Sequence, residues 1–196
     1  MTDDTMPSGA LSREQMLRLV RSERPLVAEF LDLDAQAQPN GFDLSLREVS
    51  SLHGRGVLAA SNAGRSLPAP ESMPFDADGF VDLAPGPYLV LFNEVVDLPR
   101  SVMALGRPRS SLCRSGVTVH TAVWDAGYRG RSTALLNVIN PHGFRVQRDA
   151  RLLQLVFFTL GEAAGSGYDG AYQGENLGRG AAGEDPGQAI GVRSRA

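Results

Sequence analysis

Five short apolar runs after Gly86 constrain the fold of this chain more than any other feature of its sequence. Each run is rich in β-branched or aromatic residues, and clusters of turn-forming residues separate one run from the next. Several short strands at such spacing indicate an all-β fold of the jelly-roll or barrel type. The expected strands cover residues 88–92, 101–105, 117–123, 132–139 and 152–159.

The part of the chain before Gly86 is less regular. Ser12 and Gln15 have the spacing of a capping box, which predicts a short amphipathic helix through about Arg21 on the outside of the barrel. Pro25 ends this helix, and residues 26–33 are predicted to form a strand. Residues 53–87 hold many Gly and Pro, which predicts a long excursion with a short strand near residues 79–83.

Composition predicts one domain that folds without cross-links. The chain has 196 residues, of which 42% are hydrophobic, and this is enough to bury a core. The single cysteine, Cys113, excludes an intramolecular disulfide and a tetra-cysteine zinc site, and we expect it to be a small buried apolar residue. A cytoplasmic protein is the default for such cysteine usage.

Charge and hydropathy exclude two classes of partner. The N-terminus is acidic and no long apolar run follows it, so we expect neither a secretory signal nor a membrane span. The formal net charge of -3 argues against a large nucleic-acid interface, because phosphate backbones attract basic surfaces. A local basic pocket for one small anion remains compatible with this charge.

Asp125 is a candidate general base. It lies at the tip of an apolar run and is followed by a Gly-Tyr-Arg-Gly turn signal, so residues 117–130 are predicted to form a hairpin. A carboxylate held in a tight turn can act on a water molecule or approach a metal. The alternative is an ordinary solvated turn residue, since Asp is common beside Gly in turns.

Residues 108–116, just upstream, have the composition of an anion site. They contain two arginines, two adjacent serines and a glycine. A guanidinium group matches the oxygen spacing of a phosphate, hydroxyls add short donors, and glycine permits close approach of the backbone. The alternative is a polar loop ahead of a strand.

Five segments resemble, in order, the motifs of the trimeric dUTPase and dCTP deaminase superfamily, and the chain is most similar to its archaeal-type dUTPase branch. The resemblance covers roughly residues 36–180, and the segments are residues 38–46, 107–116, 122–130, 148–157 and 168–175. It implies a distorted jelly roll (a dUTPase-like β-clip barrel) with a short N-terminal helix, assembled as a homotrimer with active sites shared between subunits. It also implies a β domain over residues 1–160 and a mobile Gly-rich C-terminal lid and tail over residues 161–196.

Within this superfamily the sequence favours hydrolysis of dUTP to dUMP and pyrophosphate. The segment from Val119 to Asp125 has the length of the dUTPase version, and Leu135 stands where deaminases of the family carry a catalytic Glu. Leucine cannot carry a proton. The alternatives are a dCTP deaminase, a bifunctional dCTP deaminase and dUTPase, and a regulatory module that binds nucleotide without turnover.

The resemblance assigns catalytic and phosphate-side roles. Asp125 matches the Asp that orients and deprotonates the attacking water. Arg109 and Ser110 match phosphate contacts, and Ser111 is expected to donate a further hydrogen bond. Gln154 matches a residue near the phosphates or that water, and Arg114 aligns with a functional Arg of the deaminases. Mg²⁺ is the implied cofactor, bridging phosphate oxygens. Asp43 either contacts the hydrated ion through water or is a structural Asp that accepts hydrogen bonds from the backbone.

Sugar, base and tail contacts are implied as well. Tyr128 matches the aromatic that lies under the deoxyribose and excludes a 2′-hydroxyl; as an alternative it is a tyrosine at the rim of a hairpin. Backbone groups from Val119 to Val123 would select the base, because this chain lacks the Asn that dUTPases often carry there. His120 either reads the base edge or is structural. Tyr172, Gln173 and Arg179 are the candidates for the γ-phosphate.

Overall fold

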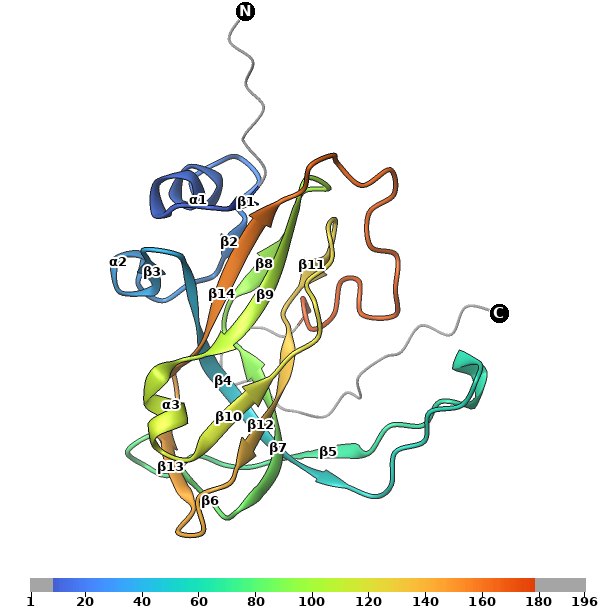
Figure 1. Cartoon of the computed structure of the whole chain (residues 1–196). Helices are drawn as coiled ribbons and strands as arrows, with labels where there is room; N and C mark the ends of the chain where they lie inside the picture. The colour runs from blue at the N-terminus through green and yellow to red at the C-terminus, as the bar shows by residue number, and fades with distance from the viewer. Residues whose placement is uncertain (1–8, 179–196) are drawn as a thin grey trace, which may run out of the picture.

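The computed structural model describes residues 9–178, and most of its strands form one curled antiparallel sheet (Figure 1). Its strands pair in the order β1-β14-β4-β7-β12-β10, with β9 paired to β14 and with β3 and β5 paired to β4. The prediction of a mostly β chain is therefore confirmed. The bounds are β1 Gly9–Ala10, β3 Ala37–Gln38, β4 Gly41–His53, β5 Ala69–Ser72, β7 Gly86–Phe92, β9 Val102–Pro108, β10 Val117–His120, β12 Thr133–Val138 and β14 Arg151–Thr159.

Two small sheets and a few short helices complete the fold. One sheet has the order β11-β8-β2, and the other pairs β13 with β6. None of the helices formed by residues 9–178 has the length and apolarity needed to span a membrane. The bounds are β2 Val27–Ala28, β6 Phe80–Leu83, β8 Val95–Asp97, β11 Arg129–Gly130, β13 Phe144–Gln147, α1 Arg13–Val20, α2 Leu33–Gln36, α3 Ser110–Arg114 and the 3-10 turn η1 Asn62–Gly64.

One hydrophobic core lies inside the curled sheet. Side chains alternate between the two faces of a strand, and β14 and β12 accordingly bury about every second residue. Strand β4 is buried on both faces over its first seven residues. The largest enclosed apolar side chains include Phe42, Phe92, Leu136, Leu152 and Phe157.

Helix α1 confirms the capping-box prediction. The Ser12 side chain accepts a hydrogen bond from the Gln15 backbone at 3.3 Å, and the Gln15 side chain accepts one from the Ser12 backbone at 2.8 Å. The helix buries Met16, Leu17 and Val20 and lies outside the curled sheet (Figure 1).

The predicted strand over residues 26–33 is wrong beyond Val27–Ala28. Glu29 has a φ of 55°, in the left-handed region, and this breaks an extended strand. Asp32 then caps α2 by accepting hydrogen bonds from two backbone N–H groups of its first turn. The capping signal therefore prevails over the apolar run that suggested a strand.

The excursion over residues 53–87 is present. Strand β4 continues to His53, and the chain returns through β5, so that residues between them form an arm that projects from the sheet (Figure 1). Leu58 on this arm is 83% exposed. Strand β6 coincides with the short strand predicted near residues 79–83.

The predicted tight hairpin over residues 117–130 is wrong. Strand β10 ends at His120 and pairs with β12, while β11 pairs with β8. Between them Trp124 pairs with Ala104 of β9 through two backbone hydrogen bonds of 2.9 and 3.0 Å. Burial of the Trp124 side chain, which is only 5% exposed, accompanies this pairing and takes the chain away from β10.

Cys113 is exposed, contrary to the expectation of a buried residue. It lies on α3, a helix of five residues whose only buried side chain is Leu112. A helix this short turns a single side chain toward the core, and Leu112 occupies that position.

Candidate functional site

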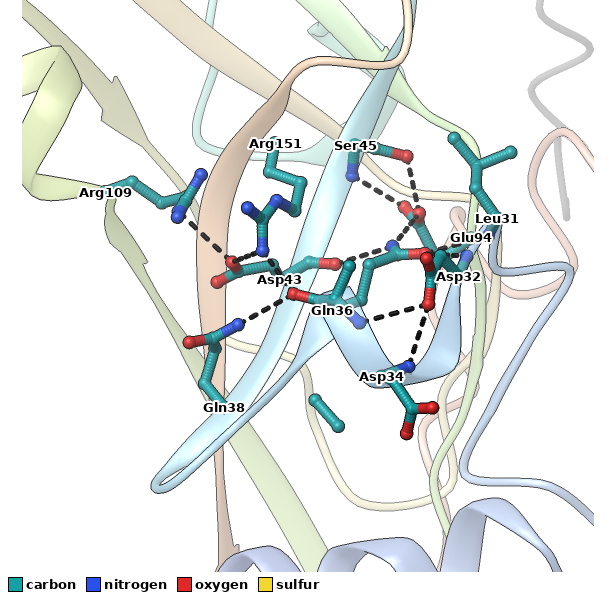
Figure 2. Close-up of polar contacts among 12 residues, drawn as sticks. Leu31, Asp32, Asp34, Gln36, Gln38, Asp43, Ser45, Glu94, Arg109 and Arg151 are labelled. Atoms are coloured by element: carbon teal, nitrogen blue, oxygen red, sulfur yellow. Dashed lines mark hydrogen bonds and ion pairs between the residues drawn. The ribbon is translucent and has the colours of Figure 1, made fainter.

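Asp43 of β4 is held between two arginines (Figure 2). Its Oδ2 lies 3.1 Å from Nε of Arg109 and 3.3 Å from Nη1 of Arg151. Burial raises the pKa of Asp43, and the positive charges of Arg109 and Arg151 oppose that rise. The Asp43 side chain is 1% exposed, whereas those of the arginines are 30% and 33% exposed. The carboxylate therefore fixes two guanidinium groups at the surface, and we call these three residues the Asp43 cluster.

A buried polar network holds β4 in place behind the Asp43 cluster (Figure 2). The amide of Gln36 donates to the Asp43 carbonyl at 2.9 Å and to the Glu94 carboxyl at 2.6 Å. The Ser45 hydroxyl also donates to Glu94, at 2.6 Å, and the Ser45 backbone at 2.9 Å. Burial raises the pKa of Glu94, and these hydrogen bonds oppose the rise. The network fixes the backbone on both sides of Leu44 and so the direction of Asp43.

Helix α3 presents the two candidate serines beside Arg109. Ser110 and Ser111 are its first two residues and both are exposed, while Arg109 stands at its N-cap position. The Arg109 backbone donates to the carbonyl of Leu152 at 3.0 Å, which ties the start of α3 to β14. Two exposed hydroxyls and a guanidinium group therefore lie together at the edge of the sheet, as an anion site requires.

Gln154 lies on β14 between the strands that carry the other candidates. It is in register with Asp43 on β4 and with Arg107 on β9. It is half-buried, and within residues 9–178 its amide makes no hydrogen bond, which leaves it available to a ligand. The structure thus places Gln154 opposite Asp43, although the two residues are far apart in the sequence.

The residues predicted to lie beside the base differ in their exposure to solvent. Val119 is buried, whereas His120 is exposed at the end of β10 and Val123 is 47% exposed in the segment that follows. His120 lies directly opposite Leu135 of β12 in the antiparallel register. Leu135 therefore faces the same end of β10 that the family resemblance assigns to the base.

Asp125 lies in a turn whose backbone is fixed, and its side chain is exposed. Tyr128 donates its N–H to the Asp125 carbonyl at 3.0 Å, and Gly127 adopts a φ of 86° that favours glycine. Trp124 anchors the turn by donating its indole N–H to the Ser132 hydroxyl at 2.6 Å. Among residues 9–178 no hydrogen bond or ion pair engages the Asp125 carboxylate, so it points to solvent from a rigid support.

Tyr128 is a core residue of this region and not a tyrosine of an open rim. It is 5% exposed, and its hydroxyl lies 2.9 Å from that of Ser132 and 2.8 Å from a carboxyl oxygen of Glu175. Its ring meets Tyr168 edge to face at 5.8 Å. Burial, followed by the charge of Glu175, raises the pKa of Tyr128, so the hydroxyl stays protonated.

The C-terminal segment packs along the Asp125 turn. Gln173 accepts a hydrogen bond from the Arg129 backbone at 2.8 Å and donates to the Gly127 carbonyl at 2.9 Å. The ring of Tyr172 instead faces the guanidinium of Arg65, on the projecting arm, at 5.7 Å. Arg179 and the remainder of the predicted tail lie outside the residues that the structure describes.

The candidate residues form two groups within one chain. The Asp43 cluster, with Ser110, Ser111 and Gln154, is one group, and the Asp125 turn with Tyr128 and Gln173 is the other. No hydrogen bond or ion pair between residues 9 and 178 joins the Asp125 carboxylate to the first group. The first group offers guanidinium, hydroxyl and amide groups, and the second offers an exposed carboxylate.

Sequence reasoning missed several residues that support these groups. Arg151 holds Asp43, Ser132 links Trp124 to Tyr128, and Glu175 caps the Tyr128 hydroxyl. All three belong to segments that the sequence singles out, but their roles depend on contacts between distant parts of the chain. The sequence offered no signal for Ser132, which lies between Arg131 and Thr133, or for Glu175, which lies between Gly174 and Asn176.

The residues that could hold a metal are few. In the described part of the chain there is no group of three or more His, Cys, Asp or Glu side chains placed to ligate an ion. Asp43 Oδ1, however, is a buried carboxylate oxygen without a hydrogen-bond partner there. Such a donor set fits an ion held mainly by substrate phosphates and water, as is usual for Mg²⁺.

The chain is similar to one protein family and to several archaeal proteins of known name. Residues 10–160 match the model of a family described as dCTP deaminase-like. A probable deoxyuridine 5′-triphosphate nucleotidohydrolase of Methanosarcina barkeri is 45% identical over 166 residues, which cover 85% of this chain and 97% of the relative. A protein of the same name from Archaeoglobus fulgidus is 44% identical over 167 residues, with the same coverage of both chains.

A solved structure shares the fold. The crystal structure of 2′-deoxycytidine 5′-triphosphate deaminase from Agrobacterium tumefaciens superposes with a TM-score of 0.60 at 21% identity. The match covers 79% of this chain and 49% of the deaminase chain, so this chain spans about half the length of that protein. At this level of identity the likeness concerns the fold alone.

Proposed function

This chain belongs to the dCTP deaminase-like family, and we propose that it is a dUTP diphosphatase, which hydrolyses dUTP to dUMP and pyrophosphate. Archaeal relatives that carry the name deoxyuridine 5′-triphosphate nucleotidohydrolase match nearly their whole length, which supports this reaction over others of the family. The observation that carries the proposal is the exposed Asp125 carboxylate on a rigid turn.

The chemistry assigned to the chain's own residues is a general-base hydrolysis. Asp125 accepts a proton from a water molecule as the water oxygen attacks the α-phosphorus of dUTP. The bond from that phosphorus to the bridging oxygen breaks, and pyrophosphate leaves with the bonding electron pair. Phosphoryl transfer depends mainly on positioning and on neutralising charge, so the residues that hold the triphosphate are as important as the base.

The triphosphate side is assigned to the other group of residues. Arg109 is held by Asp43 with its guanidinium partly exposed, and the hydroxyls of Ser110 and Ser111 lie beside it. Gln154 supplies an uncommitted amide on the neighbouring strand. Mg²⁺ bound to the phosphates would neutralise charge on the leaving pyrophosphate, with Asp43 contacting the hydrated ion through water.

A site shared between subunits would join the two groups, since no hydrogen bond or ion pair within residues 9–178 links the Asp125 carboxylate to the Asp43 cluster. The proposed general base lies on a surface turn, and among residues 9–178 no hydrogen bond or ion pair joins Arg109 to Asp125. In a homotrimer with sites between subunits, dUTP would contact the Asp43 cluster of one subunit and the Asp125 turn of another. Tyr172 and Gln173 of the C-terminal segment would add donors at the γ-phosphate.

The assay that tests the proposal follows four nucleotides by chromatography after incubation with Mg²⁺ and either dUTP or dCTP. We expect dUTP to yield dUMP and pyrophosphate, and dCTP to remain unchanged because Leu135 cannot shuttle protons for deamination. Formation of dUTP or dUMP from dCTP would contradict the monofunctional assignment and favour a deaminase or bifunctional enzyme.

A further inference from the structure

The hydroxyl of Tyr128 is fixed at two points, and one of them comes from the C-terminal segment. It donates to a carboxyl oxygen of Glu175 at 2.8 Å and lies 2.9 Å from the Ser132 hydroxyl, which the Trp124 indole engages in turn. The site is tightly closed around these atoms, since a Cβ at Gly130 would come within 2.5 Å of the Tyr128 hydroxyl oxygen. A ring held in this way cannot swing without breaking a hydrogen bond to a charged or polar partner.

The backbone of the C-terminal segment places Glu175 opposite Tyr128. Gly174 donates to the Arg129 carbonyl at 2.8 Å, and the Arg131 backbone donates to the Glu175 carbonyl at 2.9 Å. Asn176 adds a side-chain hydrogen bond of 2.9 Å to the Arg131 carbonyl. These contacts give the segment one register along residues 129–131, so Glu175 is presented to Tyr128 whenever the segment is docked.

We propose that Glu175 is a positioning residue that locks the Tyr128 ring and thereby strengthens the preference of the site for 2′-deoxyribose over ribose. The inference rests on the proposed function and on the role that the family resemblance implies for Tyr128, contact with the sugar of the nucleotide. Exclusion of a 2′-hydroxyl by a side chain requires a wall that does not yield, because a ring that moves aside admits the larger sugar. Ser132 alone leaves the ring one anchor, whereas Glu175 adds a second from a different part of the chain.

A lock on Tyr128 by Glu175 has a different kinetic effect from a contact that only holds the C-terminal segment in place. If Glu175 only held the C-terminal segment in place, its loss would slow turnover of dUTP and UTP by the same factor. A lock on Tyr128 instead changes the ratio of kcat/KM for dUTP to kcat/KM for UTP. The carboxylate acts here as a hydrogen-bond acceptor, so an amide oxygen at the same position can replace it.

The experiment measures that ratio for the full chain and its variants. Glu175→Ala should lower the preference for dUTP about 5- to 10-fold, the effect expected from loss of one hydrogen bond. Glu175→Gln should retain most of the preference. Glu162→Ala, which removes an exposed carboxylate from the same part of the chain, is the matched control and should change nothing.

A double-mutant cycle makes the test specific to the pair. Tyr128→Phe should lower the preference by itself, and adding Glu175→Ala to it should lower the preference no further, because the partner hydroxyl is already absent. Additive effects, or an unchanged ratio in Glu175→Ala, would overturn the inference. If the wild type hydrolyses no dUTP, the proposed function fails; the ratio of dUTP to UTP affinities by calorimetry then tests the lock on the same variants.

Discussion

Asp43 shows how a single buried carboxylate can organise a surface site. Its side chain is almost fully enclosed, yet both groups that neutralise it reach the surface. A charge buried in this way is tolerated only with partners, and each partner is in turn restricted in direction by the carboxylate. The arginines therefore arrive at the candidate phosphate side already ordered, which lowers the entropic cost of binding an anion.

Replacing that carboxylate should affect both stability and nucleotide binding. We expect Asp43→Asn to lower the free energy of unfolding by about 1 to 3 kcal/mol, because it leaves two guanidinium groups without a counter-charge. Urea unfolding followed by circular dichroism measures the change. Asp34→Asn, at an exposed position of α2, is the control. Equal unfolding free energies for the two variants would show that Asp43 does not stabilise this part of the fold.

Asp125 is the residue on which the catalytic assignment depends. Its carboxylate is exposed and the turn that carries it is held by Trp124, so Asp125→Asn should preserve the local structure. We expect kcat for dUTP to fall by roughly 10²- to 10⁴-fold with little change in affinity, as for loss of a general base. Asp78→Asn, in the turn before β6, should behave as the wild type. Wild-type turnover no faster than that of Asp125→Asn would favour a regulatory module that binds nucleotide without hydrolysis.

At the scale of elements, local sequence signals predicted what local interactions determine. The capping box at Ser12 and the apolar run of β14 correspond to elements whose periodicity or caps lie within a few residues. The hairpin over residues 117–130 and the strand over residues 26–33 failed, because Trp124 pairs with Ala104 and Glu29 adopts a left-handed backbone. The first outcome depends on a pairing partner in another strand, about which periodicity carries no information. The second follows from the local cap at Asp32, a signal that the prediction set below the apolar run.

The same limit applies to the candidate site. The residue types at Arg109, Ser110 and Asp125 could be predicted, since their chemistry is visible in the sequence. Their partners could not: that Arg151 shares Asp43 with Arg109, and that Glu175 meets Tyr128, follows only from the pairing of strands and from the docking of the C-terminal segment.

Docking of the C-terminal segment should depend on pH through Glu175. Burial raises the pKa of Glu175 to about 7, and the hydrogen bond from Tyr128, the titratable group that faces it, opposes the rise. In an undocked segment that pKa returns to its ordinary value of 4.5, so docking takes up a proton between these values. Docking is therefore strongest below the lower pKa, weakens as pH rises toward 7, and stays weaker above it.

The fluorescence of Trp124, the single tryptophan of the chain, reports on this docking because its indole bonds to the Ser132 that contacts Tyr128. We expect the equilibrium constant for docking to fall by about tenfold between about pH 5 and pH 8. This is less than the full change in the pKa of Glu175 would give, because Glu175 is partly exposed and solvent screens its charge. Glu175→Gln, which does not titrate, should remove the dependence. A pH response of equal size in that variant would assign the titration to another group.

At the scale of the whole molecule, the proposed shared site brings the two groups of candidate residues together from different chains. The curled sheet carries the Asp43 cluster on β4, β14 and the start of α3, whereas the Asp125 turn lies beyond β10 and is covered by the C-terminal segment of the same chain. A general base and a triphosphate site that do not meet within one subunit can meet across an interface. Rotational symmetry then creates one complete site for each interface.

We expect the protein to be a homotrimer by light scattering, and a chain ending after Ala164 to remain folded and trimeric. The residues removed contribute few apolar side chains to the core, Tyr168 being the principal one, so the sheet does not depend on them. That truncated chain should lose most of its dUTP turnover, because Tyr172, Gln173 and Glu175 are removed with the segment and the site stays open to water.

Wild-type kcat in the truncated trimer would contradict a lid role for the segment. Dissociation into monomers would instead identify it as an arm that holds subunits together, and a full-length monomer that retains activity would rule out the shared site.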